Sequence, residues 1–169
     1  MASLMEDLLD TLEQETKGYG ELLTYTEEKK KAVISSDLPA LQQVTDKEQE
    51  ATDHLKSLEV KRMKLLKSMG EVMGKDRILT VTETIALLSS QPAEQKKLTE
   101  ARDALREVAT KVQTANTRNE ALIRQALEMV EFDLTLLRGL RAAPETANYD
   151  RNAANTGALL GHSGFDAKQ

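Results

Sequence analysis

The strongest constraint on the fold is a heptad pattern in the second half of the chain. Its positions alternate in steps of three and four without a slip, and they are Leu98, Ala101, Leu105, Val108, Val112, Ala115, Asn119, Leu122, Ala126, Met129, Asp133, Leu136 and Leu140. This spacing places all of them along one side of an α-helix and is typical of coiled coils. Pro92 and Pro144 bracket the pattern, so we expect one helix over about 92–143.

A second heptad pattern lies in the first half of the chain. Its positions are Leu41, Val44, Glu48, Ala51, Leu55, Leu58, Arg62, Leu65, Met69 and Val72. We expect Asp37 to cap this helix and Pro39 to lie in its first turn, where a missing N–H does no harm. Gly74 is suited to the left-handed residue that follows a helix end. The pattern therefore predicts a helix over about 38–73.

Two further helices are expected on local signals. Apolar residues recur at helical spacing over about 4–35, where Gly18 and Gly20 predict a local bend or a close contact between helices. Thr80 and Glu83 have the spacing of a capping box ahead of a short apolar segment. That segment predicts a connector helix over about 81–89.

Together these segments predict an all-α fold. The expected architecture is an antiparallel three-helix coiled-coil bundle with a short connector helix and a flexible C-terminal tail. The bundle is expected to occupy residues 1–143 and the tail residues 144–169, which are rich in Gly and Asn. The tail nevertheless carries Tyr149, Leu159, Leu160 and Phe165, which suggests that it docks on something.

Composition excludes several classes of function. The net charge of −5, without a long basic run, argues against nucleic acid as a partner. The absence of Cys excludes disulfides, thiolate nucleophiles and Cys-based metal sites. His54 and His162 do not assemble into a catalytic or metal-binding motif with other residues, and no nucleotide-binding motif occurs. We therefore expect a cytoplasmic protein that is not an enzyme, needs no cofactor or metal and does not insert into a membrane.

The end of the long helix is the candidate partner-binding region. This helix is longer than its expected neighbours, so part of its apolar face is expected to be uncovered, and that part includes Leu134, Leu136, Leu137 and Leu140. Exposed leucines at helical spacing form a surface for recognising another helix. Alternatively, the connector helix, the tail or a second copy of the chain covers them.

Four polar residues occupy apolar-type positions in the two heptad patterns. They are Glu48, Arg62, Asn119 and Asp133. One interpretation is register control, since a polar residue in a helix seam penalises alternative pairings. The other is a polar patch where a partner helix enters.

Several motifs resemble the FlgN family of flagellar export chaperones, in the form found in Gram-positive-type genomes. The motifs are Lys30-x-x-Val33-Ile34-x-x-Asp37-Leu38-x-x-Leu41-x-x-Val44-x-x-x-Glu48, then Asn116-x-x-Asn119-x-x-Leu122-Ile123-x-x-x-Leu127, then Tyr149-Asp150 and the closing Phe165-Asp166-Ala167-Lys168-Gln169. Their order and spacing carry the resemblance over nearly the whole chain.

The resemblance implies a cytoplasmic chaperone that binds the C-terminal helical regions of hook-associated proteins 1 and 3. It would prevent their premature assembly and deliver them to the flagellar type III export apparatus. The C-terminal part of such chaperones binds the cargo, which points to Leu134, Leu136, Leu137 and Leu140 and to Tyr149, Leu159, Leu160 and Phe165. A homodimer and contacts with export components stay open, and the alternative function is a structural coiled-coil subunit of another cytoplasmic assembly.

Overall fold

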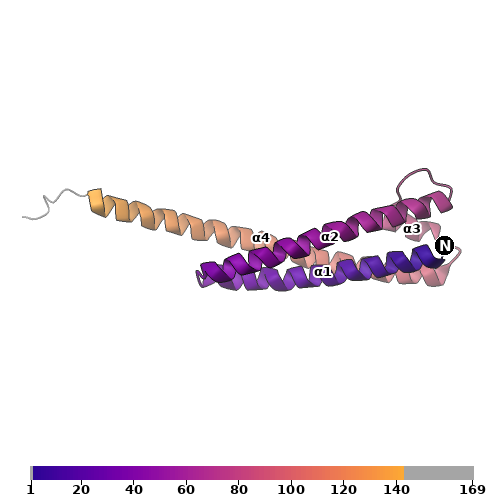
Figure 1. The fold of residues 1–169 in the computed structure, drawn as a ribbon, viewed down its shortest axis with the longest axis horizontal. Helices are drawn as coiled ribbons and strands as arrows, with labels where there is room; N and C mark the ends of the chain where they lie inside the picture. Colours follow the sequence, from indigo (N-terminus) through magenta and orange to yellow (C-terminus); the bar gives the residue numbers. More distant parts are fainter. Residues whose placement is uncertain (1, 143–169) are drawn as a thin grey trace, which may run out of the picture. The chain divides into compact units, whose positions relative to one another are not determined.

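The computed structural model describes residues 2–142, and all regular structure in this range is helical (Figure 1). The helices are α1 (Ala2–Ile34), α2 (Leu38–Val72), α3 (Val81–Leu87) and α4 (Pro92–Ala142). The prediction of an all-α helical bundle is confirmed. The predicted flexible tail lies outside the described residues. Within the described part of the chain, every helix is too short or too polar to cross a membrane.

The chain divides into two units, residues 1–126 and residues 127–169. The first unit contains α1, α2, α3 and the N-terminal part of α4. The described part of the second unit is residues 127–142, the C-terminal end of α4.

Helices α1 and α2 form an antiparallel hairpin. Ser36 adopts a left-handed φ of 55° after α1, and Asp37 then caps α2 by accepting a hydrogen bond from the Ala40 N–H at 3.0 Å. This confirms the predicted cap. Ion pairs between the two helices have a nearly constant sum of residue numbers, as antiparallel helices require, and they are Lys61–Asp10, Arg62–Glu15, Lys29–Glu48 and Lys47–Glu28.

Gly18 marks a close approach between the two helices of this hairpin. A Cβ atom on Gly18 would lie 2.8 Å from a methyl carbon of Leu55 on α2, which is closer than real side chains come. The prediction of a close helix contact is therefore confirmed at Gly18. Gly20 differs, because a Cβ atom there would meet no other atom within 4 Å.

The segment between α2 and α3 turns back over the end of α2. Gly74 has a φ of +70°, so it is the predicted left-handed residue after the helix. A Cβ atom on Gly70 would lie 2.7 Å from the Arg77 carbonyl oxygen, because the returning chain passes directly over this residue. Thr80 and Glu83 form the predicted capping box at the start of α3, and Leu79 is buried beneath it.

The main core joins α1 to both long helices. Its buried members are Met5, Leu8 and Leu12 of α1, Leu66 and Met69 of α2, Leu88 after α3, and Leu98 and Leu105 of α4. Leu98 near the start of α4 joins the same cluster as Met5 near the start of α1, whereas Asn119 reaches Thr26 further along both helices. Within the first unit, α1 and α4 therefore run in the same direction and α2 runs in the opposite one.

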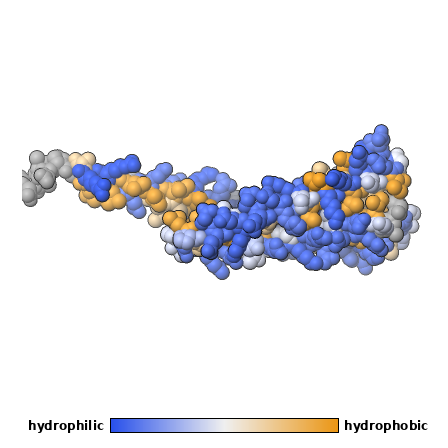
Figure 2. Space-filling model, in the orientation of Figure 1, coloured by the Kyte–Doolittle hydropathy of each residue, from blue (hydrophilic) through white to orange (hydrophobic). Residues whose placement is uncertain are grey.

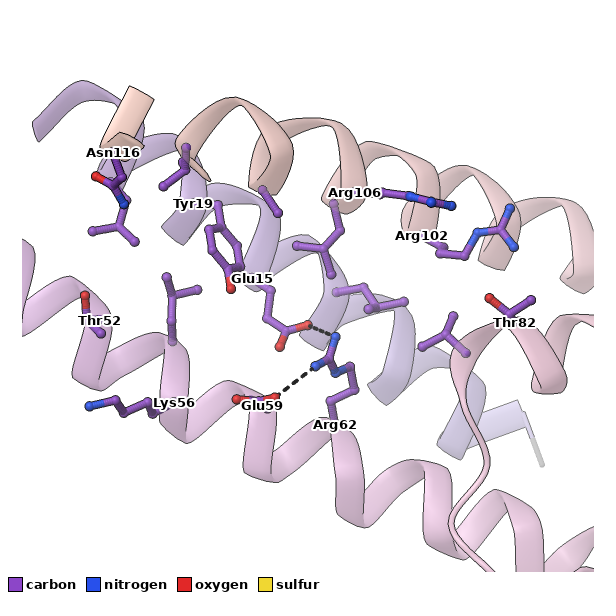
Figure 3. Close-up of a pocket in the computed structure, with 17 residues that line it drawn as sticks. Glu15, Tyr19, Thr52, Lys56, Glu59, Arg62, Thr82, Arg102, Arg106 and Asn116 are labelled. Atoms are coloured by element: carbon purple, nitrogen blue, oxygen red, sulfur yellow. Dashed lines mark ion pairs between the residues drawn. The ribbon is translucent and has the colours of Figure 1, made fainter. Parts of the chain in front are cut away.

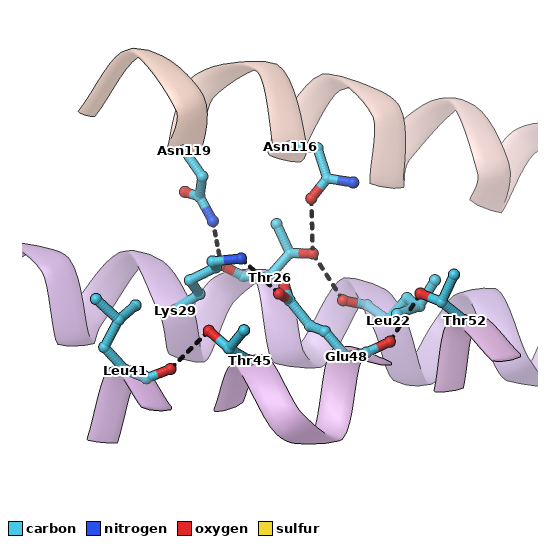
Figure 4. A network of polar contacts seen from close by, with 9 residues as sticks. All are labelled: Leu22, Thr26, Lys29, Leu41, Thr45, Glu48, Thr52, Asn116 and Asn119. Carbon is cyan, nitrogen blue, oxygen red and sulfur yellow. Dashed lines mark hydrogen bonds and ion pairs between the residues drawn. The ribbon is translucent and has the colours of Figure 1, made fainter. Parts of the chain in front are cut away.

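Three of the four polar seam residues have partners inside the first unit, and Figure 4 shows the contacts of two of them, Glu48 and Asn119. Glu48 accepts a hydrogen bond from Lys29 at 2.6 Å, and Arg62 pairs with Glu15 at 3.5 Å. Buried Asn119 donates from its side-chain amide to the Thr26 carbonyl oxygen at 2.7 Å. Asp133 is exposed in the second unit. The contacts of the first three are those that register control requires.

We expect Asn119→Ala to lower the free energy of unfolding by about 1–2 kcal/mol, because it removes a buried hydrogen bond and leaves a small void. Chemical denaturation followed by circular dichroism measures this change. Asn116→Ala is the control, since the exposed Asn116 makes only a 3.3 Å contact with the Thr26 hydroxyl. Equal effects of both substitutions would contradict a special role for Asn119.

The α3 cap predicts a defined pH dependence. Hydrogen bonds from Arg77 and then from the Thr80 backbone and side chain lower the pKa of Glu83 from 4.5 to about 2. Since this pKa is lowered in the folded state, the stabilisation is present above pH 4.5 and is lost as the pH falls towards about 2. Glu83→Gln should therefore be less stable than the unsubstituted chain at pH 7, and the difference should shrink between pH 4.5 and 2. Thermal melts across this pH range test the prediction, and a difference independent of pH would contradict it.

Candidate partner-binding surfaces

The described end of α4 carries a dense group of exposed apolar side chains. We define the C-terminal apolar surface as Leu127, Met129, Val130, Phe132, Leu134, Leu136, Leu137 and Leu140, which are between 46% and 75% exposed. In Figure 2 hydrophobic residues gather along this part of α4. The four leucines predicted from the sequence all belong to this surface.

The C-terminal apolar surface consists of two stripes. One contains Leu127, Val130, Leu134 and Leu137, and the other contains Met129, Phe132, Leu136 and Leu140. At about 100° per residue, the centres of the two stripes are about 135° apart, so together the stripes cover more than half of the helix circumference. A helix with apolar residues on two sides is suited to burial between other elements rather than to full exposure.

Four members of this surface were not predicted as site residues. Leu127, Met129, Val130 and Phe132 precede the predicted leucines by one or two helical turns. Their spacing from Leu134 and Leu136 is the signal that identifies them, and Phe132 is one of only two phenylalanines in the chain. The predicted tail residues Tyr149, Leu159, Leu160 and Phe165 lie outside the described residues.

A second surface is a groove in the first unit (Figure 3), and Arg62, one of the polar seam residues for which entry of a partner helix was one interpretation, lines it. Leu12, Tyr19 and Leu22 of α1 line it, together with residues of α2 and α4, and its volume is about 540 Å³. A neighbouring hollow of about 360 Å³ shares Leu22, Thr52 and Asn116 with it. We call the two hollows together the bundle groove.

Charged side chains from all three long helices meet along the bundle groove. Arg62, Lys56 and Glu59 of α2 face Arg102 and Arg106 of α4, and Glu15 comes from α1 (Figure 3). Arg62 lies between two carboxylates, 3.5 Å from Glu15 and 3.6 Å from Glu59. The groove is therefore a polar as well as an apolar surface.

Glu15 is the most unusual residue of the groove because it is an ionisable residue whose side chain is buried. The residue is only 2% exposed, and its Oε2 atom has no hydrogen-bond partner among the described residues, although Arg62 is near. Burial raises the pKa of Glu15, while the Arg62 charge lowers it and the Glu59 charge raises it again. The folded chain therefore leaves this carboxyl group incompletely satisfied.

Glu15→Gln should raise the stability of the chain at pH 7. Because the pKa of Glu15 is raised in the folded state, ionisation of this group costs stability as the pH rises above its ordinary value of 4.5. The gain from the substitution should be present at pH 7 and should disappear well below pH 4.5. Urea unfolding at pH 7 and at low pH measures both quantities, and a loss of stability at pH 7 would show that the Arg62 ion pair dominates.

The match to a known protein family covers the whole helical region. Residues 1–157 match the family described as FlgN protein, a range that contains all four helices and the C-terminal apolar surface. No curated protein and no solved structure matches the chain. The family match covers far more than half of the 169 residues, and the chain therefore belongs to the FlgN family of flagellar export chaperones.

Proposed function

We propose that this chain is a cytoplasmic chaperone for hook-associated proteins 1 and 3, the proteins of the hook–filament junction. It binds their C-terminal helical regions through the C-terminal apolar surface and prevents premature assembly. It then presents them to the flagellar type III export apparatus. Membership of the FlgN family supports the general chaperone role.

The exposure of the C-terminal apolar surface is the observation that carries this proposal. Leu105 and Leu140 occupy equivalent heptad positions in α4, yet Leu105 is 8% exposed and Leu140 is 75% exposed. Large apolar surfaces that stay in contact with water mark sites of interaction with other proteins. An amphipathic helix of the cargo can cover such a stripe through contacts at helical spacing.

A partner helix covering this surface also explains how the cargo is kept from assembling. An amphipathic helix whose apolar face is buried on the chaperone cannot use that face to contact other subunits. The interaction requires neither a catalytic group nor a nucleotide, because burial of apolar area supplies the free energy. Part of that gain is offset by the entropy lost when side chains and mobile segments become ordered, which keeps release possible.

The double substitution Leu136→Asp/Leu140→Asp should weaken cargo binding at least tenfold. Two carboxylates on one stripe would have to be desolvated against an apolar partner face. Isothermal titration with the C-terminal helical regions of hook-associated proteins 1 and 3 from the same genome measures the loss. Helix content by circular dichroism should stay nearly unchanged, because both leucines are exposed in the free chain.

Ile34→Asp/Leu38→Asp is the matched control. These two residues are as exposed as the leucines of α4 but lie at the α1–α2 turn. The control should bind cargo normally. Equal loss in both double variants, or no loss in either, would refute a binding site on the C-terminal apolar surface.

A chain ending at Ala143 tests the proposed contribution of Tyr149, Leu159, Leu160 and Phe165. Weaker binding by this shortened chain assigns part of the site to the segment beyond α4. Unchanged binding restricts the site to the helices. Absence of binding by the full chain would overturn the chaperone proposal and favour a structural coiled-coil subunit.

A further inference from the structure

The bundle groove has the layout of a helical bundle from which one helix is missing. Most of its lining residues recur in steps of three and four on each long helix. They are Leu12, Glu15, Tyr19, Leu22, Thr26 and Lys29 on α1, Glu48, Thr52, Leu55, Glu59 and Arg62 on α2, and Arg102, Leu105, Ala109, Val112, Asn116, Asn119 and Ile123 on α4. The other lining residues are Lys56 on α2, Val81 and Thr82 on α3, and Arg106 and Glu120 on α4. Three heptad faces that converge on one groove provide the holes into which the side chains of a further helix pack.

The length of the groove also suits a helix. From Leu12 to Lys29 the α1 lining spans 17 residue steps, which corresponds to about 26 Å of helix. A fourth helix of roughly five turns would cover this length. Such a segment is of ordinary size for a helix in a helical bundle.

The chemistry of the groove specifies which helix would fit. Apolar side chains of the occupant would meet Tyr19, Leu22 and Ala109, which line the groove and are partly exposed. Glu15 is incompletely satisfied, because its buried Oε2 atom lies 3.5 Å from Arg62 but makes no hydrogen bond among the described residues. A Lys, Arg or amide side chain would satisfy it, and a charged donor makes the stronger hydrogen bond with a carboxylate.

The rim adds a second requirement. Arg106 on α4 and Lys56 on α2 line opposite sides of the groove and are exposed. Acidic residues on the flanks of the occupant would be attracted to them. The occupant is therefore amphipathic, with acidic flanks and one donor on its apolar face.

We propose that the bundle groove binds a helix of the exported cargo as a fourth helix of the bundle, with a donor side chain of that helix hydrogen-bonded to Glu15. This inference rests on the proposed chaperone function and adds a second docking site to the C-terminal apolar surface. The groove and that surface belong to different units of the chain, so their contributions are separable by substitution.

Ala109→Phe tests the groove directly, because Ala109 lines it and a phenyl ring would occupy the place of the partner helix. Ala104→Phe is the matched control on the exposed, opposite part of the same helix. We expect at least tenfold weaker titration of the C-terminal helical regions of hook-associated proteins 1 and 3 with Ala109→Phe and no change with Ala104→Phe. Circular dichroism and urea unfolding establish that both variants fold.

Glu15→Gln separates binding from stability. The substitution is expected to stabilise the free chain at pH 7, yet it should weaken cargo binding about fivefold or more, because the charged partner of the donor is lost. A role confined to folding would move both quantities in the same direction. Unchanged affinity would remove Glu15 from the interface and overturn its proposed hydrogen bond with the cargo.

Cross-linking identifies the occupant. Because the chain has no Cys, Ala109→Cys and Ala104→Cys each carry a single thiol for a benzophenone maleimide. Cross-linking of the cargo region from position 109 but not from position 104 supports the inference. Cross-links between two copies of the chain, together with a dimer in sedimentation that Ala109→Phe dissociates, would assign the groove to a second copy and overturn it.

The two proposals fail in different ways. If Leu136→Asp/Leu140→Asp weakens binding and Ala109→Phe does not, the groove inference is wrong and the chaperone function stands. If the unsubstituted chain binds neither cargo region, both are wrong. If Ala109→Phe alone weakens binding, the cargo site lies in the groove rather than on the C-terminal apolar surface.

Discussion

The first unit depends on the packing of α1 against both other long helices. Leu8 and Leu12 are completely buried and share one core with Met69 of α2 and Leu98 of α4. Gly18 permits the close approach of α2 through Leu55. The Thr26 carbonyl oxygen accepts a hydrogen bond from the Asn119 side chain of α4. Because α1 is the common neighbour of α2 and α4, its residue Leu12 belongs to the core and also lines the groove.

Polar residues in the seams of the first unit make contacts between the helices. A buried amide such as that of Asn119 destabilises the fold unless it is hydrogen-bonded. A slip of one helix along another would break this hydrogen bond without replacing it. Glu48 and Lys29 act similarly at the edge of the groove. Glu15 is the exception, since burial disfavours its charge and Arg62 compensates only partly. A residue that lowers the stability of the free chain is a candidate for a role in binding.

Local signals in the sequence predicted the helices and several of their ends. Asp37 and the Thr80–Glu83 box act as caps, and Gly74 follows α2 in the left-handed conformation. These features depend on residues within one or two helical turns, so they can be predicted from the sequence without knowledge of the fold. The exposure of Leu134, Leu136, Leu137 and Leu140 was also predicted, because the expected helix over about 92–143 is longer than the other expected helices. The full lining of the bundle groove was not predictable, because Leu12, Thr52 and Ala109 come together from three separate helices.

The sequence by itself determined that the chain is helical and which residues share each helix face, because spacing in steps of three and four is a property of consecutive residues. Only the tertiary structure decided which members of a face are buried. Leu105 and Leu140 are separated by five whole heptads, yet one is in the core and the other is in water. Burial depends on whether another helix lies over the position, and so does the environment of Glu15, whose raised pKa follows from the surrounding helices.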